Sequence, residues 1–173
     1  MRELTTARLV LEPLTRRHAQ EMFEALSDRA IYRFIDEAPP ASVDALAARY
    51  ARLESRRSGD RREHWLNWVV RVPATGAAIG FVQASVMPDG TAFVAYVIAP
   101  SSQGRGYGRE ATATMIEELR ARYGAKVLRA NVDSRNAASI RLAAALGFAE
   151  ARRDGHDIIF ERSVGGSTAP GNH

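Results

Sequence analysis

The residues best suited to chemistry are three glycines, Gly104, Gly106 and Gly108, which alternate in a segment that also carries Arg105 and Arg109. The segment follows an apolar, strand-like run and precedes a helical pattern. Glycine lets the backbone bend freely and approach a ligand closely, and the first N–H groups of a helix attract anions. The two arginines add positive charge. The pattern therefore predicts a site for a phosphate or a pyrophosphate.

Two familiar phosphate-binding motifs fit this segment less well. A P-loop needs a lysine and a hydroxyl residue after its last glycine, but Gly108 is followed by Arg109, Glu110 and Ala111, which excludes it. A Rossmann dinucleotide site is closer, because the strand–turn–helix–strand order ends at the acidic residue Asp133. However, the third glycine comes one residue early, and the preceding strand is predicted to belong to an antiparallel hairpin. Dinucleotide binding stays as the alternative.

The composition limits the class of protein. The 173 residues suffice for one domain with a real core, and the formal net charge is +4. The arginines are scattered among acidic residues, and Lys126 is the single lysine, so no basic stripe indicates a nucleic-acid partner. The chain has no cysteine, which excludes disulfides and a thiol nucleophile, and its four histidines show no H-x-x-x-H pair, so no metal site is predicted.

The chain shows no sign of a membrane or secretory segment. No apolar run approaches the length of a membrane span, and the first residues lack the apolar centre of a signal peptide. We therefore expect a soluble, cytoplasmic protein that is a monomer or a homodimer. We expect one domain over residues 1–164 and a disordered tail over residues 165–173.

Hydrophobic periodicity predicts alternating helices and strands. In the first half we expect a strand over 9–14, a helix over 15–27, a helical turn over 31–35 and a helix over 42–57. Three strands then follow as an antiparallel meander, over 65–72, 78–86 and 91–98. After the glycine turn we expect a helix to residue 123, a strand over 126–132, a helix over 136–147 and a final hairpin around Asp154-Gly155.

Two motifs resemble those of the GNAT N-acetyltransferase superfamily. The run Gln103-Gly-Arg-Gly-Tyr-Gly108 matches the family's Q/R-x-x-G-x-G/A signature, after a Y-x-I-x-P strand end. Asn136-Ala-Ala-Ser139, followed by Gly147-Phe148, is similar to the family's second hallmark. The opening, residues 6–14, is similar to the Rim-type branch, which acetylates the N-termini of ribosomal proteins. The resemblance covers residues 5–163. It implies an α/β (α+β) fold with a mixed, mostly antiparallel sheet of six to seven strands between helices.

The resemblance also implies where acetyl-CoA binds. Backbone amides of Arg105, Gly106, Gly108 and Arg109 would hold the pyrophosphate, with Gln103 and Gly104 shaping the start of the turn. The backbone of Val97 and Ile98 would pair with pantetheine, because the next strand in the family splays away. Tyr107 would cover the adenine or merely pack.

Asn136 and Ser139 are the catalytic candidates, because the resemblance places them at the thioester end of acetyl-CoA. Each has a structural interpretation that stays open. Asn136 is well placed as a helix N-cap, and Ser139 is an ordinary residue for the first turn of a helix.

The chemistry can be narrowed further. Without cysteine an acyl-enzyme thioester is impossible, so the amine attacks bound acetyl-CoA directly in a ternary complex. Many relatives place a glutamate where Phe93 lies, and a tyrosine where Ala143 and Ala144 lie. The acid–base roles therefore stay open among Ser139 with water and a further set of residues, namely Asn131, Asp133, Glu150 and His156.

Several acceptors remain compatible with the sequence. A peptide N-terminus is expected first, and the alternatives are a small amine (amino acid, polyamine or aminoglycoside) or a non-catalytic acyl-CoA sensor. Asp36 and Glu37, in a proline-rich loop, either attract a cationic amine or simply follow a helix stop.

Overall fold

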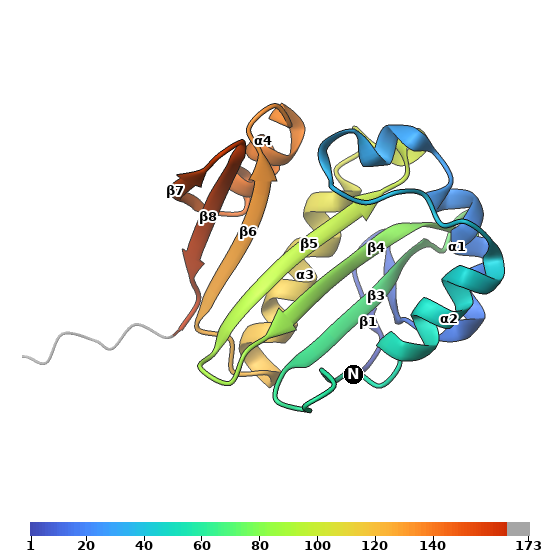
Figure 1. Cartoon of the computed structure of the whole chain (residues 1–173), viewed down its shortest axis with the longest axis horizontal. Helices are drawn as coiled ribbons and strands as arrows, with labels where there is room; N and C mark the ends of the chain where they lie inside the picture. Colours follow the sequence, from blue (N-terminus) through green and yellow to red (C-terminus); the bar gives the residue numbers. More distant parts are fainter. Residues whose placement is uncertain (166–173) are drawn as a thin grey trace, which may run out of the picture.

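The structure, a computed structural model, describes residues 1–165, whose eight strands form a single sheet (Figure 1). The strands are β1 (Leu4–Thr5), β2 (Val10–Pro13), β3 (His64–Val72), β4 (Ala77–Val86), β5 (Thr91–Ile98), β6 (Val127–Asp133), β7 (Ala149–Asp154) and β8 (Asp157–Ser163). The α-helices are α1 (Ala19–Leu26), α2 (Val43–Leu53), α3 (Tyr107–Arg122) and α4 (Ala137–Ala145). Short 3-10 turns are η1 (Arg16–His18), η2 (Arg29–Phe34) and η3 (Pro100–Ser102).

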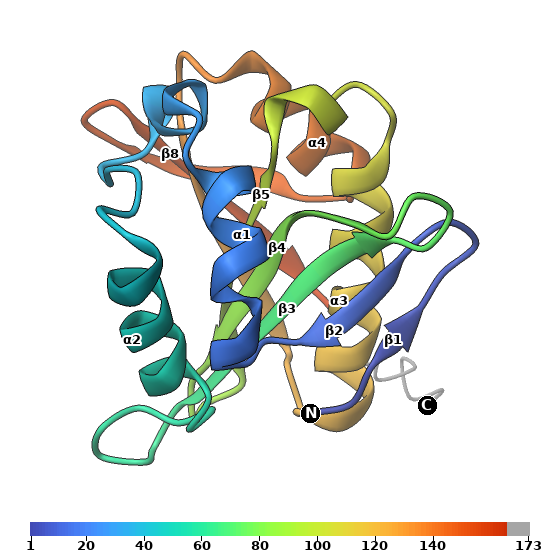
Figure 2. The same ribbon diagram turned by 90° about the vertical axis from the view of Figure 1, so that its right-hand side faces the viewer.

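The sheet has the order β1-β2-β3-β4-β5-β6-β8-β7, and its neighbouring strands are antiparallel except for the parallel pair β5 and β6. α1 and α2 lie on one face, and α3 and α4 on the other (Figure 2). The predicted mixed, mostly antiparallel sheet with helices on both faces is therefore confirmed, and so is the meander β3-β4-β5.

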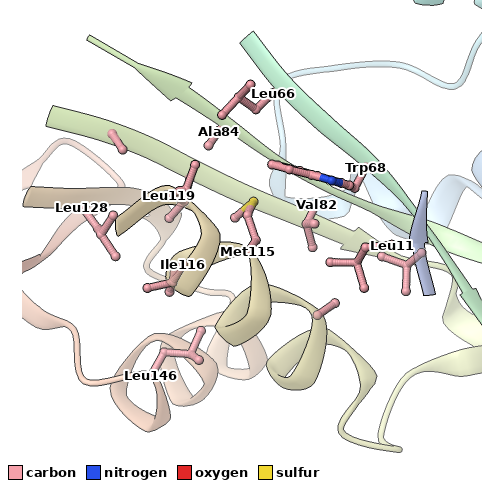
Figure 3. Close-up of a cluster of buried hydrophobic side chains, with 14 of the residues drawn as sticks. Leu11, Leu66, Trp68, Val82, Ala84, Met115, Ile116, Leu119, Leu128 and Leu146 are labelled. Atoms are coloured by element: carbon pink, nitrogen blue, oxygen red, sulfur yellow. The ribbon is translucent and has the colours of Figure 1, made fainter. Parts of the chain in front are cut away.

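Each face of the sheet has its own hydrophobic core. Met115, Ile116 and Leu119 of α3 are almost fully buried and face Trp68 and Val82 of the sheet (Figure 3). The other core joins α1 and α2 to the sheet, with Met22, Leu46 and Tyr50 packed on Val69. Apolar residues that recur every three or four positions put one face of each helix against the sheet.

The structure differs from the sequence prediction in three places. The sheet has eight strands instead of six to seven, because β1 pairs with β2 through Leu4 and Leu11; two residues are too few to show the alternation that predicts a strand. The helix predicted over 15–27 begins as η1, and the one predicted over 42–57 ends at Leu53, before Arg56 takes a left-handed φ of 59°. Of the predicted tail, residues 166–173 lie outside the described part of the chain, and the predicted domain boundary stays a prediction.

β5 and β6 pair over only three residues. Their register runs from Thr91↔Val127 to Phe93↔Arg129. β5 nevertheless stays paired with β4 as far as Ile98, and β6 stays paired with β8 as far as Asp133. The two strands therefore diverge beyond Phe93, and the second half of β5 has an open edge (Figure 1).

A bulge in β4 lies beside this open segment. The β3–β4 register shifts between Val70 and Arg71, which leaves Ile79 as an extra residue in β4. The next residue, Gly80, has a φ of 151°, a conformation that favours glycine. A Cβ on Gly80 would overlap the carbonyl oxygen of Val97 and lie 2.9 Å from the Cα of Ile98. Only glycine therefore lets β4 approach the end of β5 this closely.

This close approach predicts that Gly80→Ala destabilises the protein by about 3 kcal/mol or more, because a backbone segment must move to make room. Gly76→Ala is the matched control, since Gly76 also has a positive φ, of 71°, but has nothing within 4 Å of its would-be Cβ. The control should lose only about 1 kcal/mol. Urea unfolding of both variants measures the difference. Equal losses of unfolding free energy in the two variants would mean that the close approach of β4 to β5 does not require glycine at position 80.

Candidate active site

A cleft of about 560 Å³ runs along the open edge of β5, between the glycine turn, β6 and α4. It brings together ten of the eleven residues that the sequence predicted for the site: Val97, Ile98, Gln103, Gly104, Gly106, Tyr107, Gly108, Arg109, Asn136 and Ser139. The remaining one, Arg105, lies in the turn but does not line the cleft. Residues more than 40 positions apart thus share one concave surface. We call it the donor cleft, because these are the residues at which the resemblance places the acetyl donor, acetyl-CoA.

The three glycines of the turn serve different purposes. Gly104 and Gly106 have positive φ angles, of 74° and 79°, and Gly106 is the N-cap of α3. Gly108 instead allows close packing, because a Cβ there would lie 3.3 Å from Leu142 and 3.4 Å from Tyr96. α3 therefore begins at the wall of the donor cleft, where the sequence predicts the anion site.

The backbone direction of β5 determines which of its residues face the open edge. Ala99 N–H donates to the carbonyl of Ile79 at 2.8 Å, so Gly80 and Ile98 form a non-hydrogen-bonded pair. In an antiparallel ladder, successive residues turn their backbone groups to opposite sides. Those of Val97 therefore face β4, and those of Tyr96 and Ile98 face the gap between β5 and β6. The prediction that Val97 offers its backbone to a ligand is therefore corrected to Tyr96.

The Ile98 carbonyl already has a partner in the glycine turn. Gln103 Nε2 donates to this oxygen at 2.8 Å. This hydrogen bond supports the predicted role of Gln103 in shaping the start of the turn. It also agrees with an Ile98 carbonyl that points away from β4.

Arg8, which is not among the site residues predicted from the sequence, supports the turn from the N-terminal segment. Its Nη1 donates to the carbonyl of Arg105 at 2.9 Å, and its guanidinium lies 4.8 Å from the centre of the Tyr107 ring. Glu110 of α3 pairs with Arg8 at 2.6 Å and accepts a hydrogen bond from Thr6. Burial acts to raise the pKa of Glu110, but the bonds from Thr6 and Arg8 outweigh it and lower the pKa. The carboxylate is therefore ionised at neutral pH.

Asn136 and Ser139 form the start of α4, and each has a structural partner. Asn136 Oδ1 accepts a hydrogen bond from Ser139 N–H at 3.1 Å, as an N-cap does. Ser139 Oγ lies 2.9 Å from the hydroxyl of Tyr96 on β5. Burial raises the pKa of Tyr96, so its hydroxyl keeps its proton at neutral pH. Tyr96 is not among the site residues predicted from the sequence, because many relatives carry a tyrosine at the positions of Ala143 and Ala144, on α4, instead.

The acidic candidates are poorly placed to act as a base. Asp133 lines the donor cleft, but Arg135 binds both of its oxygens, and these bonds lower the pKa of Asp133 to about 2. Glu150 pairs with Arg153 at 2.7 Å, and His156 lies in the β7–β8 turn; neither lines a cleft described for residues 1–165. Asn131 does line the cleft, but a neutral amide is not a base.

A second cleft, of about 380 Å³, opens toward α2. It is lined by Arg49, Leu53, Trp65, Asn67, Gln83, Ala84, Ser85, Phe93, Val94, Ala95 and Asn131. We call it the acceptor cleft. Three of these residues, Val94, Ala95 and Asn131, line the donor cleft as well, so the two clefts meet where β5 and β6 part. Asp36 and Glu37 line neither cleft, and Glu37 is paired with Arg49 at 3.2 Å.

Comparison with known proteins decides the family. The model of the acetyltransferase (GNAT) domain matches residues 8–149. The chain belongs to the GNAT acetyltransferase family. The resemblance drawn from the two motifs is thereby confirmed, as is the prediction of an acetyltransferase that uses acetyl-CoA, the acetyl donor of GNAT enzymes.

Solved GNAT structures share the fold along almost the whole chain. The ribosomal-protein-S5-alanine acetyltransferase from Vibrio fischeri has a TM-score of 0.81 at 17% identity, over 93% of this chain and 96% of that one. RimL, a ribosomal L7/L12 alpha-N-protein acetyltransferase solved in complex with coenzyme A, has a TM-score of 0.78 at 15% identity, over 93% and 97%. Identities this low show the fold alone.

One curated relative matches locally. The L-methionine sulfoximine/L-methionine sulfone acetyltransferase of Salmonella typhimurium is 47% identical over 51 residues, which are 30% of this chain and 29% of that protein. The match thus spans less than a third of the relative's length.

Among residues 1–165 of this GNAT protein, no helix combines the length and apolar character needed to cross a membrane.

The contacts of Arg8 predict that this residue positions the glycine turn. Arg8→Ala should weaken coenzyme A binding about 3- to 10-fold, because the Arg105 carbonyl and the Tyr107 ring lose their support. Arg17→Ala is the control, since Arg17 is exposed and makes no side-chain hydrogen bond within the described part of the chain. Titration calorimetry measures both. Unchanged coenzyme affinity in a less stable Arg8→Ala protein would leave Arg8 with a purely structural role.

Proposed function

We propose that this GNAT protein transfers the acetyl group of acetyl-CoA to a primary amine by direct attack in a ternary complex. The expected acceptor is a peptide N-terminus, and a small amine is the alternative. One observation carries the proposal: the donor and acceptor clefts share Val94, Ala95 and Asn131, at the point where β5 and β6 diverge. A donor and an acceptor that enter from different clefts can meet there.

The donor cleft suits the parts of acetyl-CoA in turn. The positive-φ glycines and the start of α3 offer backbone N–H groups to the pyrophosphate, and Arg109 adds a positive charge. The backbone groups of Tyr96 and the N–H of Ile98, which face the gap, would pair with pantetheine as an added strand would, while Gln103 keeps its bond to the Ile98 carbonyl. The thioester would then lie toward the start of α4, near Asn136 and Ser139.

The proton balance of the reaction can be assigned in part. The amine nitrogen bonds to the acetyl carbon, the C–S bond breaks, and the coenzyme A thiolate takes up a proton. The Tyr96 hydroxyl, which stays protonated and hydrogen-bonds Ser139, would supply that proton. Since Asp133 is bound by Arg135, the proton of the amine would leave through water.

Two other candidates each have some support. The local likeness to a methionine sulfoximine acetyltransferase favours a small amine. A non-catalytic acyl-CoA sensor is favoured by Asp133, because the carboxylate in the donor cleft is paired with Arg135 and not free to act as a base.

The activity test measures the release of coenzyme A from acetyl-CoA with a panel of peptides, amino acids, polyamines and aminoglycosides.

Gly106→Val should weaken coenzyme A binding roughly 10-fold or more, because a side chain strains the positive φ and crowds the pyrophosphate. Gly124→Val is the matched control at the other end of α3, with a φ of 66° and open space around it.

Three outcomes would contradict the proposal. Tighter binding of NAD than of coenzyme A would favour the dinucleotide alternative. Full coenzyme affinity in a folded Gly106→Val protein would remove the glycine turn from the site. Coenzyme binding without turnover on any amine would favour the sensor.

A further inference from the structure

Three side-chain amides lie in a row across the floor of the acceptor cleft. Asn67 of β3 pairs in register with Gln83 of β4, which pairs with Ala95 of β5. Because Phe93 is in register with Arg129, Asn131 of β6 occupies the position opposite Ala95, across the gap. Residues in register point to the same face of a sheet. All four line the acceptor cleft.

These amides lie just beyond the sheet area that the helices cover. The neighbouring row, Val69, Phe81 and Val97, packs into the core formed with α1 and α2. Asn67 is only 7% exposed, yet within residues 1–165 its side chain makes no hydrogen bond, and neither do those of Gln83 and Asn131. A polar side chain as buried as Asn67 usually has a partner, whereas Gln83 is half-buried and Asn131 is exposed in the cleft. The amides therefore have donors and acceptors available for a polar ligand.

The charge in the acceptor cleft is positive. Among the described residues that line it, Arg49 is the one charged side chain, and there is no carboxylate. Arg49 makes a single bond to Glu37, at 3.2 Å, and about half of each of these side chains is exposed. Such exposed pairs are weak, so most of the guanidinium remains available to an anionic group on a ligand.

We propose that the acceptor is a primary amine that carries a carboxylate close to it, and that Arg49 binds this carboxylate. The inference rests on the proposed function. The amine would lie at the gap beside Ala95 and Asn131, and the polar part of the ligand would meet the amides of Asn67 and Gln83. Two sources share this chemistry: a free α-amino acid, and a peptide with an acidic residue next to its N-terminus.

The same charge pattern disfavours polycationic acceptors. A polyamine or an aminoglycoside would enter the acceptor cleft without a carboxylate to balance its charges, and it would meet Arg49 instead. A positive charge near the reacting amine also lowers the pKa of that amine. The lower pKa helps the amine to lose its proton, because no free base is found among the described residues that line the clefts.

The experiment compares each amino acid with its carboxamide, which keeps the amine and removes the negative charge. In Arg49→Gln, the KM of the carboxylate acceptor should rise roughly 10-fold, while that of the carboxamide should hardly change. Arg52→Gln is the control, because Arg52 is exposed on the same helix and does not line the cleft. It should leave both values unchanged. Glu37→Gln should lower the KM of the carboxylate acceptor by roughly 2-fold, since it frees Arg49.

The same assay shows whether the carboxylate belongs to a free amino acid or to an acidic peptide, because the preferred acceptor has the lower KM. It also separates the proposed acetyltransfer from the proposed role of Arg49. If no amine is acetylated, the proposed function fails, and calorimetry of the same carboxylate and carboxamide ligands with the coenzyme A complex still tests the role of Arg49. Equal effects of Arg49→Gln on carboxylate and carboxamide, a preference for polyamines, or a rise in KM on Glu37→Gln would overturn the inference.

Discussion

The parallel pairing of β5 and β6 ends after three residues, and the whole candidate site depends on this early end. If the ladder continued, the backbone groups of Tyr96 and Ile98 would bind β6 and would not be free for a ligand. The donor and acceptor clefts would then be separated by a continuous sheet. Because the strands part at Phe93, the clefts meet beside Ala95 and Asn131.

Contacts on both sides keep the strands apart. β4 presses against the end of β5 at Gly80, where a Cβ would overlap the Val97 carbonyl, and Gln103 holds the Ile98 carbonyl from the glycine turn. β6 follows β8 as far as Asp133, whose carboxylate binds Arg135 before α4 begins. Each strand thus has a partner that draws it away from the other. The open edge is therefore built into the fold by contacts within the chain.

The sequence predicts well what local interactions decide. The meander, the glycine turn and the Asn136 N-cap depend on periodicity, backbone freedom and one capping bond, all of which can be seen within a few residues. What it missed depends on distant contacts. Arg8 meets Arg105 across 97 positions, and Ser139 meets Tyr96 across 43. The sequence leaves two roles open for Asp36 and Glu37; neither residue lines the acceptor cleft, whereas Arg49, which pairs with Glu37, does.

The proposed function requires that coenzyme A completes the edge of β5. Amide hydrogen exchange at Tyr96, Val97 and Ile98, followed by NMR with and without coenzyme A, shows whether it does. The amides of Tyr96 and Ile98 face the gap and should exchange fast in the free protein and much more slowly with coenzyme A bound. The Val97 amide, already directed at β4, should be protected in both states. Equal exchange at Tyr96 and Ile98 with and without bound coenzyme A would mean that the coenzyme does not pair with this edge.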